Sequence, residues 1–277
     1  MPLVFLGATT NPWNSLLLAP RRSWPSQLHS ALFTIFFDMM PNQTELPEFR
    51  IDECGHGWRV LVGTRPVKTP AGNELVSPNQ ELANIIVTEL RASIEEKAPP
   101  GPASKLVNTV LDRAGEDRGA WVASAAAQLL EDALLIRVPE PEALRQMQDR
   151  HAEAFLRHAE NLLGPLPSPS ISLSFPKPDD KVFSKAESFL HGLDDFSLLS
   201  LVGMGERCRS FLMAYGHLHG GCGVGGLGDY LFAEEVWQEK LWGEDTEALD
   251  RRRHMLDDLA SFSRIACLAT QNNQNGQ

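Results

Sequence analysis

The glycine-rich segment 221–226, GCGVGG, has the spacing G-x-G-x-x-G of a dinucleotide-binding turn. In that motif the glycines let backbone amides approach a pyrophosphate, but only where a strand precedes them and a helix follows within a βαβ unit. The preceding residues, RCRSFLMAYGHLH, are typical of a helix, so the pattern favours a flexible loop between two helices. A nucleotide-dependent enzyme that uses residues 220–228 remains the alternative.

Histidines and cysteines near this segment are candidate metal ligands, because imidazole and thiolate both bind zinc. The candidates are Cys208, His217, His219 and Cys222. Their spacing matches no zinc finger or catalytic helix. His151 and His158 fall on one face of an expected helix, but a general base also needs an oriented partner, and the sequence indicates none. We therefore expect no metal, no cofactor and no catalytic residue.

An acidic segment with two tryptophans lies near the C-terminus. Seven carboxylates and one lysine fall between Glu234 and Asp250, and three arginines follow directly. Carboxylates early in a helix complement its dipole, but seven exceed that need. Trp237, Leu241 and Trp242 add large apolar groups, and tryptophan is enriched among interface anchors. The pattern indicates either a buried helix with an acidic, solvated back or a surface that contacts another protein.

The segment 63–75, GTRPVKTPAGNEL, combines turn residues with cations and could be taken for a phosphate cradle. Phosphate loops place their glycines at a helix N-terminus, whereas these glycines lie between short strands. Pro66 and Pro70 lack the amide hydrogen that a central strand needs. We expect an edge strand and a turn, with Lys68 in solvent.

The elements around these residues predict an α+β fold. Residues 48–52 and 58–62 alternate as strands do, and Ser77 followed by Pro78 and Gln80 predicts a capped helix start. After residue 119 helical patterns dominate, with a proline- and serine-rich connector at 165–180. Helices are expected at residues 120–138, 141–163, 182–193, 195–215 and 232–267, the last in one or two pieces.

This layout suggests a small β-rich N-terminal domain with a packed helix, followed by an all-α C-terminal domain. The expected ranges are a leader at 1–44, the β-rich domain at 45–116, the helical domain at 117–269 and a disordered tail at 270–277. With 277 residues, 43% of them hydrophobic, the chain is long enough for this arrangement.

The formal net charge of −11 argues against nucleic acid as a partner, because such binding needs a cationic face. The four cysteines form no C-x-x-C pair, which favours a reducing compartment. No apolar run approaches the roughly 20 residues of a membrane span. We expect no membrane insertion.

Residues 1–44 have two interpretations. They contain short apolar runs, two arginines and no acidic residue before Asp38, as in a mitochondrial transit peptide. Alternatively, translation begins at Met39 or Met40, and the preceding residues have no folded role. The lack of a convincing arginine-rich amphipathic start favours the bacterial cytoplasm over the mitochondrial matrix.

Three segments, in order, resemble the Atp12 family, the assembly chaperones of the F1 part of ATP synthase. The first resembles the family's signature hairpin through Gly57, Trp58, Arg65, Pro66, Val67, Lys68, Thr69, Pro70, Ala71, Gly72 and Asn73. The second fits L-x-N-T-x-x-D-R through Leu106, Asn108, Thr109, Asp112 and Arg113. The third resembles a C-terminal motif through Trp237, Gln238, Trp242, Gly243, Asp245, Glu247 and Ala248.

Several positions depart from the family pattern. Leu90 and Ser93 replace a tryptophan and a glutamine, and Lys240 falls where glutamate is frequent. The sequence DALLIRV stands where D-L-L-C-Y-R is usual, and the glycine-rich segment replaces part of a helix. These departures concern the partner surface more than the fold, since Leu for Trp keeps an apolar group but loses contact area.

The resemblance implies a chaperone, not an enzyme, that binds the unassembled F1 α subunit until the β subunit takes its place. The expected partner-binding residues are Trp237, Trp242, Glu244, Asp245 and Glu247, with Arg65 and Lys68 as secondary contacts. The carboxylates are expected to face cations of the client. An acidic helical adaptor for another partner is a further alternative.

Overall fold

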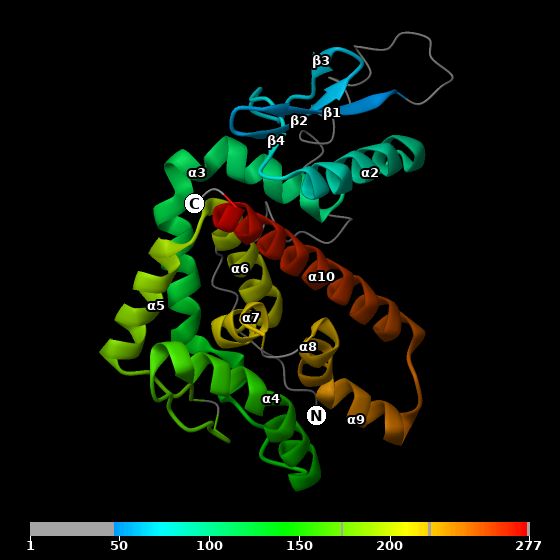
Figure 1. The fold of residues 1–277 in the computed structure, drawn as a ribbon. Helices are drawn as coiled ribbons and strands as arrows, with labels where there is room; N and C mark the ends of the chain where they lie inside the picture. Colours follow the sequence, from blue (N-terminus) through cyan, green and yellow to red (C-terminus); the bar gives the residue numbers. More distant parts are fainter. Residues whose placement is uncertain (1–46, 173, 221–222, 276–277) are drawn as a thin grey trace.

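The structure, a computed structural model, describes residues 47–172, 174–220 and 223–275. The expectations for residues 1–44 and for Cys222 therefore lie outside the described residues. Figure 1 shows a small sheet at one end of the molecule and helices in the rest of it. The predicted α+β class, with the sheet first and the helices after it, is confirmed.

The sheet is antiparallel and is centred on its second strand. Its strands are β1 (Phe49–Cys54), β2 (Gly57–Val62), β3 (Arg65–Pro66) and β4 (Val76–Ser77). β1, β3 and β4 all pair with β2. Gly57 has a φ of 145°, and a Cβ there would lie 2.3 Å from the carbonyl oxygen of Ser77. Only glycine therefore lets β4 lie beside the start of β2.

Helix α2 (Gln80–Glu96) begins two residues later than the sequence predicts. The N-cap is Asn79, whose Oδ1 accepts a hydrogen bond from the amide of Leu82 at 2.8 Å. The expected N-cap, Ser77, belongs to β4 and pairs with Trp58. Sheet pairing fixes the backbone of Ser77 in the strand, so the next residue able to cap takes that role.

One face of α2 covers the sheet, as Figure 1 shows. The buried residues of this contact are Val60, Val67 and Leu75 from the sheet region and Leu82, Ile86 and Leu90 from α2. The amphipathic helix predicted from residue spacing is confirmed.

Helix α3 (Pro102–Ala127) runs without a break across the domain boundary expected between residues 116 and 117. Gly115 and Gly119 are helical, and a Cβ at either position would meet no atom within 4 Å. Leu106 and Trp121, from the two halves of the helix, belong to one hydrophobic cluster. The sheet region and the helical region therefore share a core.

Short 3-10 turns follow α3 at η2 (Gln128–Glu131) and η3 (Ala133–Leu135). The remaining helices are α4 (Glu142–Leu163), α5 (Asp180–Gly192), α6 (Asp195–Cys208), α7 (Phe211–Leu218), α8 (Val224–Leu231), α9 (Ala233–Trp242) and α10 (Thr246–Asn275).

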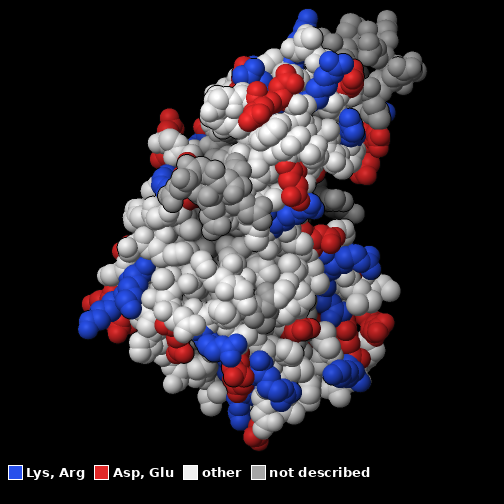
Figure 2. Space-filling model, in the orientation of Figure 1, with Lys and Arg blue, Asp and Glu red and all other residues white. Residues whose placement is uncertain are grey.

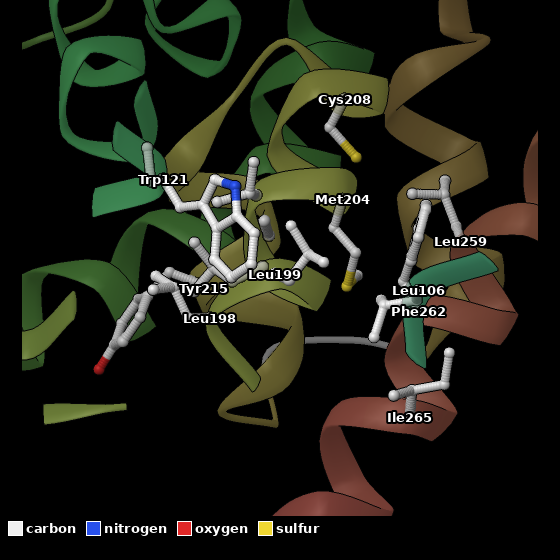
Figure 3. Packing of buried hydrophobic residues seen from close by; sticks show 14 of the residues in the cluster. Leu106, Trp121, Leu198, Leu199, Met204, Cys208, Tyr215, Leu259, Phe262 and Ile265 are labelled. Atoms are coloured by element: carbon white, nitrogen blue, oxygen red, sulfur yellow. The ribbon is translucent and has the colours of Figure 1, made fainter. Parts of the chain in front are cut away.

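Helix α6 is the centre of the helical region. Every residue from 197 to 205 is buried, and both α3 and α10 pack against this helix. Figure 3 shows Trp121 of α3 on one side of it and Phe262 of α10 on the other. A Cβ at Gly203 would lie 2.9 Å from the Phe262 ring, so this glycine allows α10 to approach closely.

The helix predicted at residues 195–215 is wrong in one respect, because it is two helices. Arg209 has a φ of 52°, which ends α6. Ser210 then caps α7, since its side chain accepts a hydrogen bond from the amide of Met213 at 2.9 Å.

Helix α10 links the two ends of the molecule. Near its C-terminal end, the carbonyl of Leu268 accepts a hydrogen bond from Asn79 Nδ2 at 2.6 Å. One turn earlier, Arg264 forms an ion pair with Glu81 of α2 at 2.7 Å. The helix continues to Asn275, into the segment expected to be a disordered tail.

Candidate partner-binding surface

Helices α9 and α10 meet in the segment 241–247, which we call the C-terminal tip. α9 ends at Trp242, and Gly243 follows with a φ of 93°, a conformation that favours glycine. Asp245 Oδ1 accepts a hydrogen bond from the amide of Glu247 at 2.9 Å, so Asp245 acts as the N-cap of α10. In Figure 1 the tip lies at the end of the molecule away from the sheet.

The end of α9 exposes large apolar side chains. Trp242 is 84% exposed and Leu241 65% exposed, and Val236 lies on the same helix at 36%. Trp237 is only half-buried. These three side chains make the end of α9 a candidate contact surface, because grouped, exposed apolar residues often belong to binding sites.

The seven carboxylates between Glu234 and Asp250 differ in their surroundings, and the three predicted to face a partner are Glu244, Asp245 and Glu247. Glu235 and Glu239 face Arg252, and Asp250 pairs with Arg253 at 3.0 Å. Glu244 and Glu247 are exposed, and neither forms an ion pair with another residue in the part of the chain described. Asp245 is also exposed but has its capping role. The tip therefore presents two uncompensated negative charges beside an exposed indole.

The hairpin that matches the family signature is fastened to helix α3. Asp112 accepts hydrogen bonds from the Thr69 hydroxyl, from the amide of Ala71 at 3.1 Å and from Asn73 Nδ2 at 2.9 Å. Asn73 Nδ2 also donates to the carbonyl of Leu111 at 3.3 Å. The TPAGN segment is thus held by one carboxylate, which gives it a structural role.

Sequence reasoning did not assign this role to Asp112. One feature of the sequence pointed to it: the two groups of the contact, residues 69–73 and Asp112, each belong to a motif of the resembled family, TPAGN and L-x-N-T-x-x-D-R. Nothing in the spacing along the chain shows that residues 69 and 112 meet, because 43 residues separate them.

The proposed secondary contacts, Arg65 and Lys68, lie at the opposite end of the molecule from the C-terminal tip, as the positions of β3 and α9 in Figure 1 show. Lys68 is 3.7 Å from Glu74, which also pairs with Arg59 at 2.9 Å. Arg65 lies exposed on β3. The structure therefore does not bring these cations together with the tryptophans. Figure 2 shows basic and acidic side chains interspersed around the sheet, without a large patch of one sign.

The histidines named in the sequence have packing roles. His217 is buried, and its Nε2 lies 2.8 Å from Ser263 Oγ. His219 stacks against Tyr215 with 4.4 Å between ring centres. Burial lowers the pKa of His219, and the charge of His158 lowers it further. Within the described residues, no three His, Cys, Asp or Glu side chains are grouped to hold a metal ion.

The glycine-rich segment differs from the flexible loop that was predicted. Gly223 is the N-cap of α8, which begins at Val224. The element before it is the helix α7, and every strand of the described chain precedes residue 78. The strand that a dinucleotide-binding turn requires is therefore missing from this position.

A membrane span would need a long, apolar helix. Of the helices in the described ranges, none has the length and hydropathy to cross a bilayer.

An α+β chain whose helical body ends in an exposed, acidic and aromatic tip shares its fold with solved structures of other proteins. Atp12 from Paracoccus denitrificans is 22% identical, with a TM-score of 0.71 over 81% of this chain and 97% of that one. A point mutant of the same protein gives a TM-score of 0.71 at 21% identity, over 82% of this chain and 97% of that one. The Atu1473 protein of Agrobacterium tumefaciens is 22% identical, with a TM-score of 0.72 over 87% and 94% of the two chains.

The family described as ATP12 chaperone protein matches residues 45–160. The resemblance stated from the sequence is thus confirmed for this segment, and the solved Atp12 structures show the same fold for the chain. The matched segment contains the hairpin and Asp112 but ends before the C-terminal tip. No protein with a curated description matches the sequence.

Proposed function

We propose that the protein is an assembly chaperone of ATP synthase that binds the free F1 α subunit through its C-terminal tip and catalyses no reaction. The family and the fold support an assembly chaperone. The single observation that carries the choice of site is the exposure of Trp242, at 84%, beside the uncompensated carboxylates of Glu244 and Glu247.

The size of the apolar contact suits a temporary partner. A tryptophan can bury about 200 Å² on binding, which at about 25 cal/mol per Å² corresponds to about 4 kcal/mol for the exposed part of Trp242. Association costs several kcal/mol in lost rigid-body freedom. One indole and its neighbours therefore give a moderate affinity, which lets the β subunit displace the chaperone.

The carboxylates of the tip add selectivity more than affinity. Exposed charges steer a partner of opposite sign and repel a partner of the same sign, and salt screens both effects. A client segment with apolar groups flanked by lysine or arginine fits this surface. We propose that the α subunit presents such a segment where the β subunit later binds.

Coexpression tests the proposal. The F1 α subunit encoded in the same genome is produced with and without this protein, and its soluble fraction is measured. We expect more soluble α subunit and a copurifying complex. An α subunit that stays equally aggregated and unbound contradicts the proposal, and capture of a different protein from extract supports an adaptor instead.

The compartment is part of the proposal. We propose the bacterial cytoplasm, because the matched structures with a stated source come from bacteria.

A further inference from the structure

Arg252 lies in the second turn of α10 and points its guanidinium at α9. It forms an ion pair with Glu239, and its Nε is 3.8 Å from Glu235 Oε2. Its Cζ also lies 5.9 Å from the ring centre of Phe232, the residue before α9. One side chain of α10 thus lies near three groups, the residue before α9 and two glutamates in the first two turns of that helix.

This arginine and Glu239 form an unusually buried ion pair. Their side chains are 10% and 17% exposed. In every other ion pair found within the described ranges, at least one partner is 31% exposed or more. Charges in a less polar environment attract each other more strongly, and a buried charge that loses its partner is strongly unfavourable. The pair therefore strongly favours the docked position of α9.

Little of the apolar surface of α9 is buried, although this helix lies against α4 and α8. Ala233 is the buried residue of this helix, and no residue of α9 belongs to the main hydrophobic cluster. The buried residues that α10 contributes to that cluster begin at Leu259, and Met255 and Leu256 pack against it partly buried. Helix α9 and the first two turns of α10 therefore lie outside the main core. The contact between these two segments includes the ion pair of Arg252 with Glu239.

We propose that Arg252 is a positioning residue, which docks α9 on α10 and so fixes the orientation in which Trp242 and Glu244 meet the partner. The inference rests on the proposed function, because it concerns the same tip. A surface held in its binding geometry loses little conformational freedom on binding, whereas an undocked α9 would have to be ordered first. Loss of Arg252 should therefore weaken partner binding although no contacting residue changes.

The test compares Arg252→Met with a control, Arg253→Met, in the full-length protein. Arg253 is the neighbouring residue on the same helix, is 69% exposed and pairs with Asp250. Hydrogen exchange is followed for peptides that cover residues 233–247 and residues 198–204. For Arg252→Met we expect at least tenfold faster exchange in the first peptide and at least tenfold weaker binding of the α subunit. The α6 peptide and the control variant should change less than twofold.

A charge exchange separates positioning from general damage. Glu239→Arg alone should also free α9, whereas Glu239→Arg combined with Arg252→Glu restores opposite charges at the same two positions. We expect the double variant to recover slow exchange in α9 and at least a third of the lost binding free energy. A merely destabilised protein would not recover when a second substitution is added.

Three outcomes overturn the inference. The first is unchanged hydrogen exchange of α9 in Arg252→Met. The second is faster exchange of α9 in that variant with unaltered binding of the α subunit. The third is a double variant whose exchange and binding are no better than those of the single variants. Failure of the proposed function appears differently, because the unaltered protein would then fail to solubilise or bind the α subunit. Exchange of α9 would still report whether Arg252 docks it.

Discussion

The residues of the C-terminal tip look alike in the sequence and have different roles in the structure. Trp242 is exposed to solvent, whereas Trp237 is half-buried. Asp245 caps α10, while Glu244 and Glu247 have no charged partner in the described part of the chain. Partner binding is therefore best tested first at Trp242 and Glu244, where a change removes the least internal structure.

Trp242→Ala should weaken binding of the α subunit by about 30- to 150-fold, since truncation of a central tryptophan anchor costs about 2–3 kcal/mol. Titration calorimetry with purified α subunit, or pull-down at graded concentrations, measures the change. The free energy of unfolding should shift by less than about 0.5 kcal/mol because the side chain is exposed. Ile171→Ala, at another exposed apolar residue (58%), is the control and should bind normally.

Glu244→Lys should slow association with the α subunit several-fold at low salt, and the defect should shrink as salt screens the charges. Stopped-flow association at low and high ionic strength measures it. Glu153→Lys changes the net charge equally at an exposed position on α4 and serves as the control. Equal slowing in both variants would mean that the overall charge, and not the tip, steers the partner.

At the scale of elements, most helices were predictable because their apolar residues recur at helical spacing. The errors arose where a contact distant in sequence decided the local structure. Ser77 has the residue type of an N-cap but is used by the sheet, so Asn79 caps α2. Nothing near Arg209 in the sequence marks the break before α7, because arginine rarely adopts a positive φ. α8 was missed because glycine weakens the helical pattern.

The contact between the hairpin and α3 can be broken at one residue. Asp112→Ala removes the acceptor of three hydrogen bonds that hold residues 69–73, and we expect a loss of about 2–4 kcal/mol in unfolding free energy. Urea denaturation measures it, and hydrogen exchange should rise first in residues 67–75. Glu116→Ala, an exposed carboxylate on the same helix, should cost less than about 0.5 kcal/mol. A similar loss in both variants would argue against the clamp.

At the scale of the whole molecule, the fold class and the resemblance to the Atp12 family followed from the sequence, but the arrangement of the surface did not. The acidic segment could be identified by composition, yet composition does not show which carboxylates meet Arg252 and which face solvent. That division depends on how α9 packs against α10, which no local pattern encodes. Likewise, the single cluster that joins the two halves of α3 replaces the expected boundary at residue 116.

One buried carboxyl group, Asp132, and one partly buried one, Glu206, make the stability of the whole molecule depend on pH. Burial raises the pKa of Glu206 to about 7 from 4.5, although Arg207 opposes the shift. Burial also raises the pKa of Asp132 to about 6 from 3.8, despite hydrogen bonds from Leu212 and Ser210. A folded-state pKa above the unfolded value means that the folded protein binds the proton more tightly. This contribution is complete below pH 4.5 for Glu206 and is lost as the pH rises toward 7.

Glu206→Gln should therefore stabilise the protein at pH 8 and have little effect at pH 4.5. The full shift corresponds to about 3 kcal/mol, and solvent screening of this partly exposed group reduces the expected gain to about 1–2 kcal/mol. Thermal or urea unfolding at both pH values measures it. Glu131→Gln, at an exposed carboxylate, should show no such pH dependence. A gain that is the same at both pH values would point to packing instead of ionisation.

The reach of α10 limits which clients can be held at two places. The helix rises about 33 Å from Thr246 to Leu268, at 1.5 Å per residue. Thr246 follows the exposed tryptophan closely in the chain, and the Leu268 carbonyl accepts a hydrogen bond from Asn79, the residue before α2. A short peptide can occupy one extremity only. A folded subunit wide enough to contact both the C-terminal tip and the sheet end would bind bivalently. A competing subunit could then displace it in two steps, one end before the other.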